Sequence, residues 1–355
     1  MRYAAALILF GAVLGLAVVE VALRVVGFDD PSLKQAQQFR WIPHPFLPYA
    51  GRPLGNFTHR NQRYPEVEHI EHNSYGFRTH EFPARKDPGD LVVVCFGEST
   101  TYGTTASNEQ TWPARLERIL AAHWPQRRVR VYNLGLDMAT TTVSVVNLGL
   151  IGVHLRPDIV VVYHGNDLLV TGSPDFRTDH SHFFRDIDVG DPLFGMPAWL
   201  SWSHAARYSF GKAGSTFSGN DLLSVATKQG SVHMGQLMSD GPGRYHGIEA
   251  TLENLRTIHS IVAGAGGHVL FSTYHVRDPN PAVTHYNERL RSFFDENDFA
   301  YVDQEGLIPD NDLTLNFDFC HFTEKGDEMM ARNFAEAIIG YGWVAASPVT
   351  GTSGG

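Results

Sequence analysis

The sequence predicts a three-layer α/β protein, in which a central parallel sheet of about five strands lies between two layers of helices. Leu91–Phe96 and Ile159–Tyr163 are continuous apolar runs, as strands that are covered on both faces require. Segments with the apolar periodicity of helices alternate with such runs along the chain. This alternation implies crossover connections between parallel strands, and therefore an α/β/α arrangement.

The first half of the predicted domain alternates strand and helix. Leu91–Phe96 is followed by the helix Trp112–Ala122, whose leucines and isoleucine form one apolar stripe. Val129–Tyr132 is the second strand and Val143–Ile151 the second helix. The third strand, Ile159–Tyr163, is β-branched and aromatic throughout, which is the composition that strands favour.

The second half continues the same alternation after a long interruption. Ile248–Ala263 is a predicted helix that ends in a run of glycines, and the strand His268–Thr273 follows it. Ala282–Glu296 is helical and Ala300–Val302 is a short strand. Glu324–Ile339 is the closing helix.

We expect four regions along the chain: a membrane anchor (1–28), an irregular arm (29–90), the α/β domain (91–342) and a flexible tail (343–355). Prolines recur through the arm, and proline forbids long helices. Within the domain, the alternation stops over residues 171–247. A connection of this length is usually a lid or a binding loop, so we interpret it as an insertion.

Residues 3–26 are apolar enough to form a membrane anchor. No charged residue precedes Glu20 within this segment, and a bilayer core needs about 20 mostly apolar helical residues. Arg2 precedes it and Asp29 follows, so the positive-inside tendency places the rest of the chain in the periplasm or outside the cell. A cleaved signal peptide and a soluble helix are the alternatives. Glu20 and Arg24, four residues apart, can pair on one helix face.

Composition excludes several classes of protein. The chain has 38 acidic and 28 basic residues, for a net charge of -10, which disfavours nucleic-acid binding through phosphate contacts. Only Cys95 and Cys320 occur, so neither a disulfide scaffold nor a cysteine-rich zinc module is available, although one bridge between them stays open. Gly264–Gly267 lacks the strand-first order of a dinucleotide fingerprint. We therefore expect no cofactor.

Polar residues follow the predicted strands at the edge where α/β sheets bind ligands. Ser99 follows the first strand, Gly135 the second and Asn166 the third, while Asp318 and His321 precede the last helix. Taken singly, each residue also fits a helix cap or a turn. Together they supply a nucleophile, a base, an orienting acid and hydrogen-bond donors, which is the working set for acyl transfer.

The spacing of these residues fits defined roles. Asp318 can fold back onto one nitrogen of His321, three residues later, which leaves the other nitrogen free to take the proton of Ser99. Asn166 offers amide hydrogens to a carbonyl oxygen. Glycine at position 135 lets a backbone N–H approach a ligand closely.

At these residues the chain resembles the SGNH hydrolases, also called GDSL esterases or lipases, over roughly residues 91–342. The resemblance implies a flavodoxin-like fold and a catalytic triad of Ser99, Asp318 and His321. It also implies an oxyanion hole formed by the backbone N–H groups of Ser99 and Gly135 and by the side chain of Asn166.

Two further segments bear on this resemblance. Glu98 stands where the family usually has Asp, next to the nucleophile. Asn73–Arg78 is similar to the arm of membrane-anchored bacterial members. The departure at Glu98 affects the positioning of Ser99 more than its chemistry, because this acid is not a triad member.

We therefore expect a membrane-anchored serine esterase or acylhydrolase that forms an acyl-enzyme on Ser99 and acts on a small-molecule, lipid or glycan ester, without a metal. An acyltransferase that acylates an envelope glycan or lipid is the alternative, and a binding module without chemistry is the third hypothesis. A metal site at His180 and His182 is less favoured, because loop residues of this kind are usually solvated. A nucleophilic Cys320 is also less favoured, because adjacent residues rarely present sulfur and imidazole to each other.

Overall fold

The computed structural model describes residues 2–26, 40–57, 69–171, 176–184, 200, 202–209 and 247–344. The chain divides into two compact units, Met1–Ala50 with Ile187–Thr227 and Gly51–Asp186 with Lys228–Gly355. Most of the predicted insertion at 171–247, parts of the arm and most of the tail lie outside the described residues.

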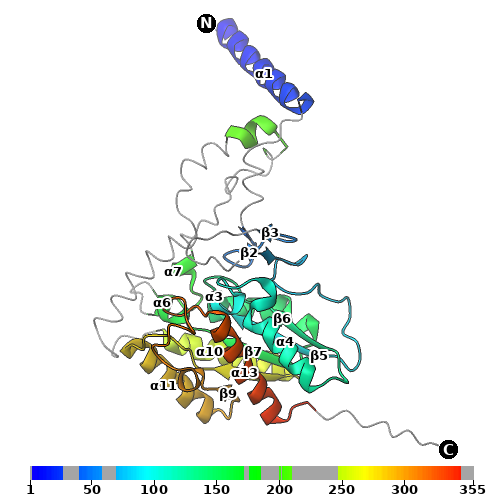
Figure 1. Ribbon diagram of the computed structural model, residues 1–355. Coiled ribbons are helices and arrows are strands. Elements are labelled where there is room, and N and C mark those ends of the chain that lie inside the picture. Colours follow the sequence, from blue (N-terminus) through cyan, green and yellow to red (C-terminus); the bar gives the residue numbers. More distant parts are fainter. Residues whose placement is uncertain are drawn as a thin grey trace, which may run out of the picture. The chain divides into compact units, whose positions relative to one another are not determined.

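The larger unit is built on a five-stranded parallel sheet with the strand order β6-β5-β7-β8-β9 (Figure 1). The strands are β5 (Leu91–Gly97), β6 (Val129–Asn133), β7 (Ile159–Tyr163), β8 (His268–Ser272) and β9 (Tyr301–Val302). The predicted parallel sheet is confirmed, with strand ends within one residue of the prediction. Every residue of β5 and β7 is buried, as their uninterrupted apolar composition requires.

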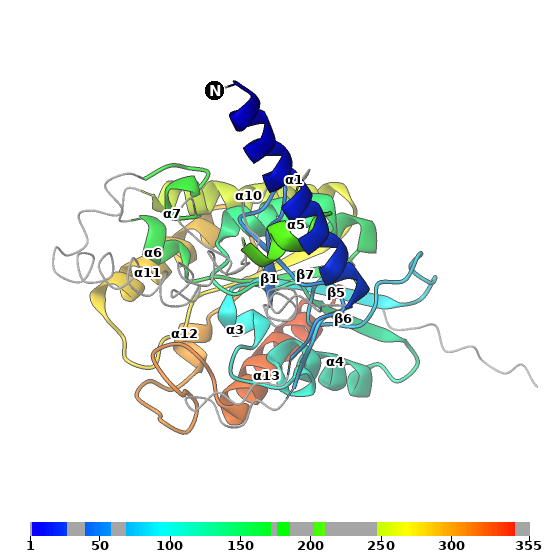
Figure 2. The same cartoon turned by 90° about the horizontal axis from the view of Figure 1, so that it is seen from above.

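Helices cover both faces of this sheet (Figure 2). On one face, α4 (Trp112–His123) packs against α13 (Glu324–Tyr341). On the other, α5 (Thr141–Leu150) packs against α10 (Ile248–Gly264), and α11 (Pro281–Glu296) lies next to α10. Each helix was predicted, with its ends displaced by at most two residues.

Local sequence signals fix where these helices begin. The Thr111 side chain accepts a hydrogen bond from the Ala114 N–H at the start of α4, and Asn280 does the same for α11. A proline stands in the first turn of each of these two helices, where its missing N–H has no intrahelical role. The sequence therefore starts both helices at positions that need no tertiary contact.

Short elements were not predicted. They are the helices α3 (Ser99–Tyr102), α6 (Asp167–Thr171), α7 (Ser181–Phe184) and α12 (Gln304–Leu307), the 3-10 turns η1 (Asn108–Gln110) and η2 (Gly152–Leu155), and the two-residue strands β1 (Trp41–Ile42), β2 (Ala50–Gly51), β3 (Asn56–Phe57) and β4 (Ile70–Glu71). Elements of two to five residues are too short to show a periodicity. Ser99, predicted to follow the first strand, is the first residue of one of these short helices.

The smaller unit contains α1 (Arg2–Val25), which covers most of the predicted anchor. The expected pair on its surface is present, since Arg24 Nε donates to Glu20 Oε1 over 2.8 Å. The Glu20 carboxylate also accepts from the backbone N–H groups of His204 and Ala205. A search of the described part of the chain for helices suited to crossing a bilayer found none.

Candidate active site

The candidate nucleophile lies at the carboxyl end of β5. The strand ends at Gly97 and the helix α3 begins at Ser99. A side chain at Gly97 would lie 2.0 Å from Thr101 Oγ1 and 2.5 Å from the Tyr163 carbonyl oxygen, so the close approach requires glycine. Gly103, with φ of 82°, ends the helix in the left-handed conformation. This tight geometry presents Ser99 at the ligand-binding edge of the sheet.

The candidate base and acid lie in the loop before α13. Asp318 Oδ1 accepts hydrogen bonds from the backbone N–H of Cys320 (3.2 Å) and of His321 (3.0 Å). The loop is closed by the Phe317 N–H, which donates to the His321 carbonyl oxygen over 2.8 Å. These bonds fold Asp318 back onto His321 within four residues.

The structure brings Ser99, His321 and Asp318 into one hydrogen-bonded row. His321 Nε2 lies 2.8 Å from Ser99 Oγ, and its Nδ1 lies 3.0 Å from Asp318 Oδ1. Burial alone would lower the pKa of His321, but the neighbouring Cys320 and the hydrogen bond to Asp318 outweigh it and raise the pKa well above its usual value. The row can pass a proton from the serine hydroxyl to the imidazole.

Glu98 also contacts the nucleophile. Its Oε2 lies 3.0 Å from Ser99 Oγ, and its Oε1 accepts from the Thr100 hydroxyl over 2.8 Å. The carboxyl is fully buried, and burial raises its pKa. The Ser99 hydroxyl donates to Glu98 Oε2 in this arrangement, and its one hydrogen cannot serve Glu98 and His321 together.

The three predicted oxyanion-hole donors have different surroundings. The Ser99 N–H belongs to the first turn of α3, where helical N–H groups have no acceptor within the helix. Asn166 follows β7, the neighbour of β5, and its buried Nδ2 has no hydrogen-bond partner among the described residues. The Gly135 N–H instead donates to Asn133 Oδ1 over 2.9 Å. The Ser99 N–H and the Asn166 side-chain amide are therefore available as donors, whereas the Gly135 N–H is bonded within its own turn.

Glycine is nevertheless required at position 135. A side chain there would lie 2.5 Å from the backbone nitrogen of Tyr102 and 2.8 Å from the carbonyl carbon of Thr101. The turn after β6 therefore packs directly on the nucleophile helix. The Asn133 side chain adds a second link, since its Nδ2 donates to the Thr101 carbonyl oxygen over 2.7 Å.

A second serine, histidine and aspartate lie close together where α5 contacts the loop after β7. Ser144 Oγ is 2.7 Å from His164 Nε2, but His164 Nδ1 is 4.0 Å from Asp167 Oδ2, beyond hydrogen-bond reach. All three are buried, and burial lowers the pKa of His164 to about 4. Asp167 accepts instead from Thr141 and Thr251 hydroxyls. This group is a buried polar network that anchors the loop carrying Asn166.

The arm holds the nucleophile helix from the other side. The buried Arg78 guanidinium donates to the carbonyl oxygens of Tyr102 (3.2 Å), Gly103 (2.6 Å) and Ala106 (2.7 Å). These carbonyls lie at and beyond the end of α3, where helical carbonyls lack intrahelical partners. The resemblance had singled out Asn73–Arg78, but only the structure shows that Arg78 caps the helix that bears Ser99.

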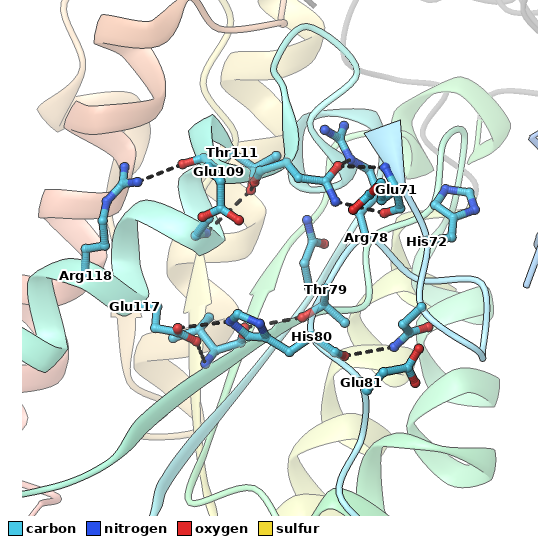
Figure 3. A pocket seen from close by; sticks show the side chains of 15 residues that line it. Glu71, His72, Arg78, Thr79, His80, Glu81, Glu109, Thr111, Glu117 and Arg118 are labelled. Carbon is cyan, nitrogen blue, oxygen red and sulfur yellow. Dashed lines mark hydrogen bonds and ion pairs between the residues drawn. The ribbon is translucent and has the colours of Figure 1, made fainter. Parts of the chain in front are cut away.

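A polar cavity of about 340 Å³ lies next to this contact, between the arm, η1, α4 and the edge strand β6 (Figure 3). Its lining includes Glu117, whose Oε1 lies 3.0 Å from His80 Nε2 and whose Oε2 accepts from the Val131 N–H over 2.7 Å. None of the triad residues lines it. Side chains of α4 and the arm form hydrogen bonds with the backbone N–H and carbonyl of Val131, on the unpaired edge of β6.

The structure also bears on the less favoured metal site at His180 and His182 and on the two cysteines. His180 Nδ1 lies 2.9 Å from Thr140 Oγ1 and His182 Nε2 lies 3.2 Å from the Val170 carbonyl oxygen, while three of the nearby aspartates lie outside the described residues. Both cysteines are free, so no bridge joins them. The expectation that Cys320 avoids its neighbour was wrong, because Cys320 Sγ lies 3.8 Å from His321 Nδ1.

A serine, a histidine and an aspartate in one row at the edge of an α/β sheet define the type of site that serine hydrolases use. The model of the GDSL-like lipase/acylhydrolase family matches residues 95–329. The chain belongs to this family, and it is a hydrolase of the esterase or acylhydrolase type. A search of curated proteins returned no match.

The chain also aligns with solved structures of enzymes at low sequence identity. LAE5, an alpha/beta hydrolase enzyme from the metagenome of Lake Arreo, is 17% identical with a TM-score of 0.44, covering 72% of this chain and 96% of its own. An acetylxylan esterase from Geobacillus stearothermophilus is 14% identical with a TM-score of 0.43, covering 72% and 97%. The lipase/acylhydrolase from Enterococcus faecalis is 15% identical with a TM-score of 0.42, covering 71% and 96%.

Proposed function

We propose that the protein hydrolyses a carboxylic ester through an acyl-enzyme on Ser99. The observation that carries this proposal is the 2.8 Å separation of Ser99 Oγ from His321 Nε2, combined with the 3.0 Å separation of His321 Nδ1 from Asp318 Oδ1. In this row Ser99 is the nucleophile, His321 the general base and then the general acid, and Asp318 the group that orients the imidazole.

The reaction proceeds in two balanced halves. Ser99 Oγ forms a bond to the ester carbonyl carbon while His321 takes the hydroxyl proton, and the proton passes to the alcohol oxygen as the ester bond breaks. Water then attacks the acyl-enzyme, gives a proton to His321, and the acid leaves as Ser99 recovers its hydrogen. The Ser99 N–H and the Asn166 amide stabilise the oxyanion in both halves. The Gly135 N–H is the third proposed donor, and it joins them by exchanging its bond to Asn133 Oδ1 for one to the oxyanion.

The test is a Ser99→Ala variant, assayed with p-nitrophenyl esters and with a fluorophosphonate probe. We expect kcat to fall by about 10⁴-fold or more, because the nucleophile is lost, and labelling to disappear. Ser144→Ala is the matched control, since it removes the other serine that contacts a histidine. If labelling survives in Ser99→Ala and disappears in Ser144→Ala, the nucleophile is Ser144 and the proposal for Ser99 is refuted.

Acyl transfer to an envelope glycan or lipid is the alternative use of the same acyl-enzyme. The two activities differ only in the group that accepts the acyl chain. Product analysis with water and sugar acceptors in competition separates them, since a hydrolase yields free acid at every acceptor concentration. The substrate class in either case is a small-molecule, lipid or glycan ester.

We also propose that residues 3–26 attach the protein to a membrane, with the larger unit in the periplasm or outside the cell. Support comes from the apolar sequence and from the exposed side chains of α1, among them Leu7, Ile8 and Phe10. Exposed apolar surface of this extent on a long helix indicates a membrane or protein contact.

A further inference from the structure

Cys320 lies beside the base of the triad and has no role in the proposed reaction. Its Sγ is 3.8 Å from His321 Nδ1, the nitrogen that also contacts Asp318. The carboxylate of Asp318, the thiol and this nitrogen all lie within 4.8 Å of one another. Among the described residues this is the one group of three such side chains with that spacing.

The separations match those between ligands of one zinc ion. Zinc binds sulfur at about 2.3 Å and nitrogen or carboxylate oxygen at about 2.0 to 2.2 Å. At a tetrahedral angle these lengths place nitrogen and oxygen about 3.4 Å apart and nitrogen and sulfur about 3.6 Å apart. The observed values are 3.0 to 3.1 Å for His321 Nδ1 to Asp318 and 3.8 Å for Nδ1 to Cys320. These two separations differ from the tetrahedral values by a few tenths of an ångström, and the sulfur–oxygen separation is within 4.8 Å.

We propose that Asp318, Cys320 and His321 form an inhibitory site for a thiophilic divalent cation such as Zn²⁺ or Cd²⁺. The three side chains supply one oxygen, one sulfur and one nitrogen, and water supplies the fourth ligand, which is the ligand set of an open zinc site. Each of the three is only partly buried, so a hydrated ion can reach them. This inference rests on the proposed function of the same triad.

The bound ion would stop catalysis by moving a proton. Metal binding requires the thiolate, so Cys320 releases its proton to solvent. The neutral imidazole coordinates through Nδ1, and its single hydrogen therefore moves to Nε2. Nε2 faces Ser99 Oγ at 2.8 Å and then donates a hydrogen bond instead of accepting one. His321 can no longer take the serine proton, although substrate binding is not obstructed at Ser99.

The first experiment titrates ester hydrolysis with Zn²⁺ and with Cd²⁺, and restores the enzyme with EDTA. We expect reversible inhibition that lowers kcat, and a loss of metal affinity of at least about tenfold in Cys320→Ser, with each variant normalised to its own metal-free rate. Cys95→Ala is the matched control, because it removes the other cysteine, which is fully buried in β5. It should keep the sensitivity of the unaltered protein. Equal sensitivity of Cys320→Ser and the unaltered protein would overturn the proposal, as would the absence of inhibition.

A second experiment does not depend on activity. Co²⁺ replaces zinc in such sites and gives a thiolate charge-transfer absorption band when sulfur is a ligand. We expect this band in the unaltered protein and in Ser99→Ala, and its loss in Cys320→Ser. A charge-transfer band in Ser99→Ala, together with no ester hydrolysis by the unaltered protein, would refute the esterase proposal and retain the metal site. Ester hydrolysis by the unaltered protein without a charge-transfer band would refute the metal site and retain the esterase proposal.

Discussion

Ser99 Oγ has two close partners, and a single hydroxyl hydrogen cannot serve both of them. Oγ lies 2.8 Å from His321 Nε2 and 3.0 Å from Glu98 Oε2. Since burial raises the pKa of Glu98, its neutral form can donate to Oγ while the serine hydrogen points to His321. We predict that the acid before the nucleophile is a positioning group that acts in this protonated form.

This argument predicts different outcomes for two substitutions of Glu98. Glu98→Gln keeps a neutral donor and an acceptor in the same place, so kcat should change by only a few fold. Glu98→Ala leaves buried hydroxyls without a partner, at a cost of about 1 to 3 kcal/mol, and should lower kcat by about 10- to 100-fold. The measurement is kcat with a small ester, with the melting temperature as control. Equal losses in both variants would show that the charged form is needed.

Side chains at strand ends could be predicted from sequence because the carboxyl edge of a parallel sheet gathers them. Ser99, Gly135 and Asn166 were chosen on that basis, and His321 because it precedes the last helix. The structure places Ser99 and His321 in contact. The bond from Gly135 to Asn133 and the contact of Cys320 with His321 could not be predicted. Both depend on the path of a turn over a few residues, which leaves no pattern in the sequence.

At the scale of elements, the Arg78 side chain caps the carboxyl end of α3. This helix has four residues, and the guanidinium donates to three carbonyl oxygens at and after its end. A helix this short is not stable by itself, because too few of its hydrogen bonds offset the cost of nucleation. The arm therefore fixes the orientation of the helix that carries the nucleophile.

We predict that Arg78→Met destabilises the protein by about 3 kcal/mol, because the buried carbonyl oxygens of Tyr102 and Ala106 lose this donor. It should also lower kcat for a small ester while KM changes little, and Arg78→Lys should recover part of the loss. Urea unfolding and steady-state kinetics measure the two effects. Arg118→Met is the matched control from the same cavity. Its exposed side chain donates to the Glu109 carbonyl oxygen, and the substitution should cost no more than about 0.5 kcal/mol. A kcat that is unaltered in folded Arg78→Met would contradict the positioning role.

The long elements followed from the sequence because burial on two faces leaves a strong signal. β7 was predicted at its observed bounds, and α4 and α10 end one residue beyond the prediction. The helix α3 was missed because its stability comes from Arg78 and not from its own residues. The same holds for the paired strands of the arm, whose two residues each carry no alternation.

At the scale of the whole molecule, the chain divides into a unit that contains α1 and a unit that contains the triad. The hydrogen bonds that define the candidate site all lie within the larger unit. The proposed membrane attachment and the proposed chemistry therefore involve different residues, and changes in α1 do not alter any residue of the candidate site.

The last prediction uses this separation. In the full chain, Val13→Asp and Leu14→Asp together should move the protein from the membrane fraction to the soluble fraction, because each buried charge near the centre of a membrane helix costs about 2.5 to 3.5 kcal/mol. Val13→Ile with Leu14→Ile is the matched control and should remain with the membranes after carbonate extraction. Both variants should hydrolyse a soluble p-nitrophenyl ester at the rate of the unaltered protein. Unaltered protein that is recovered in the soluble fraction would exclude attachment through residues 3–26.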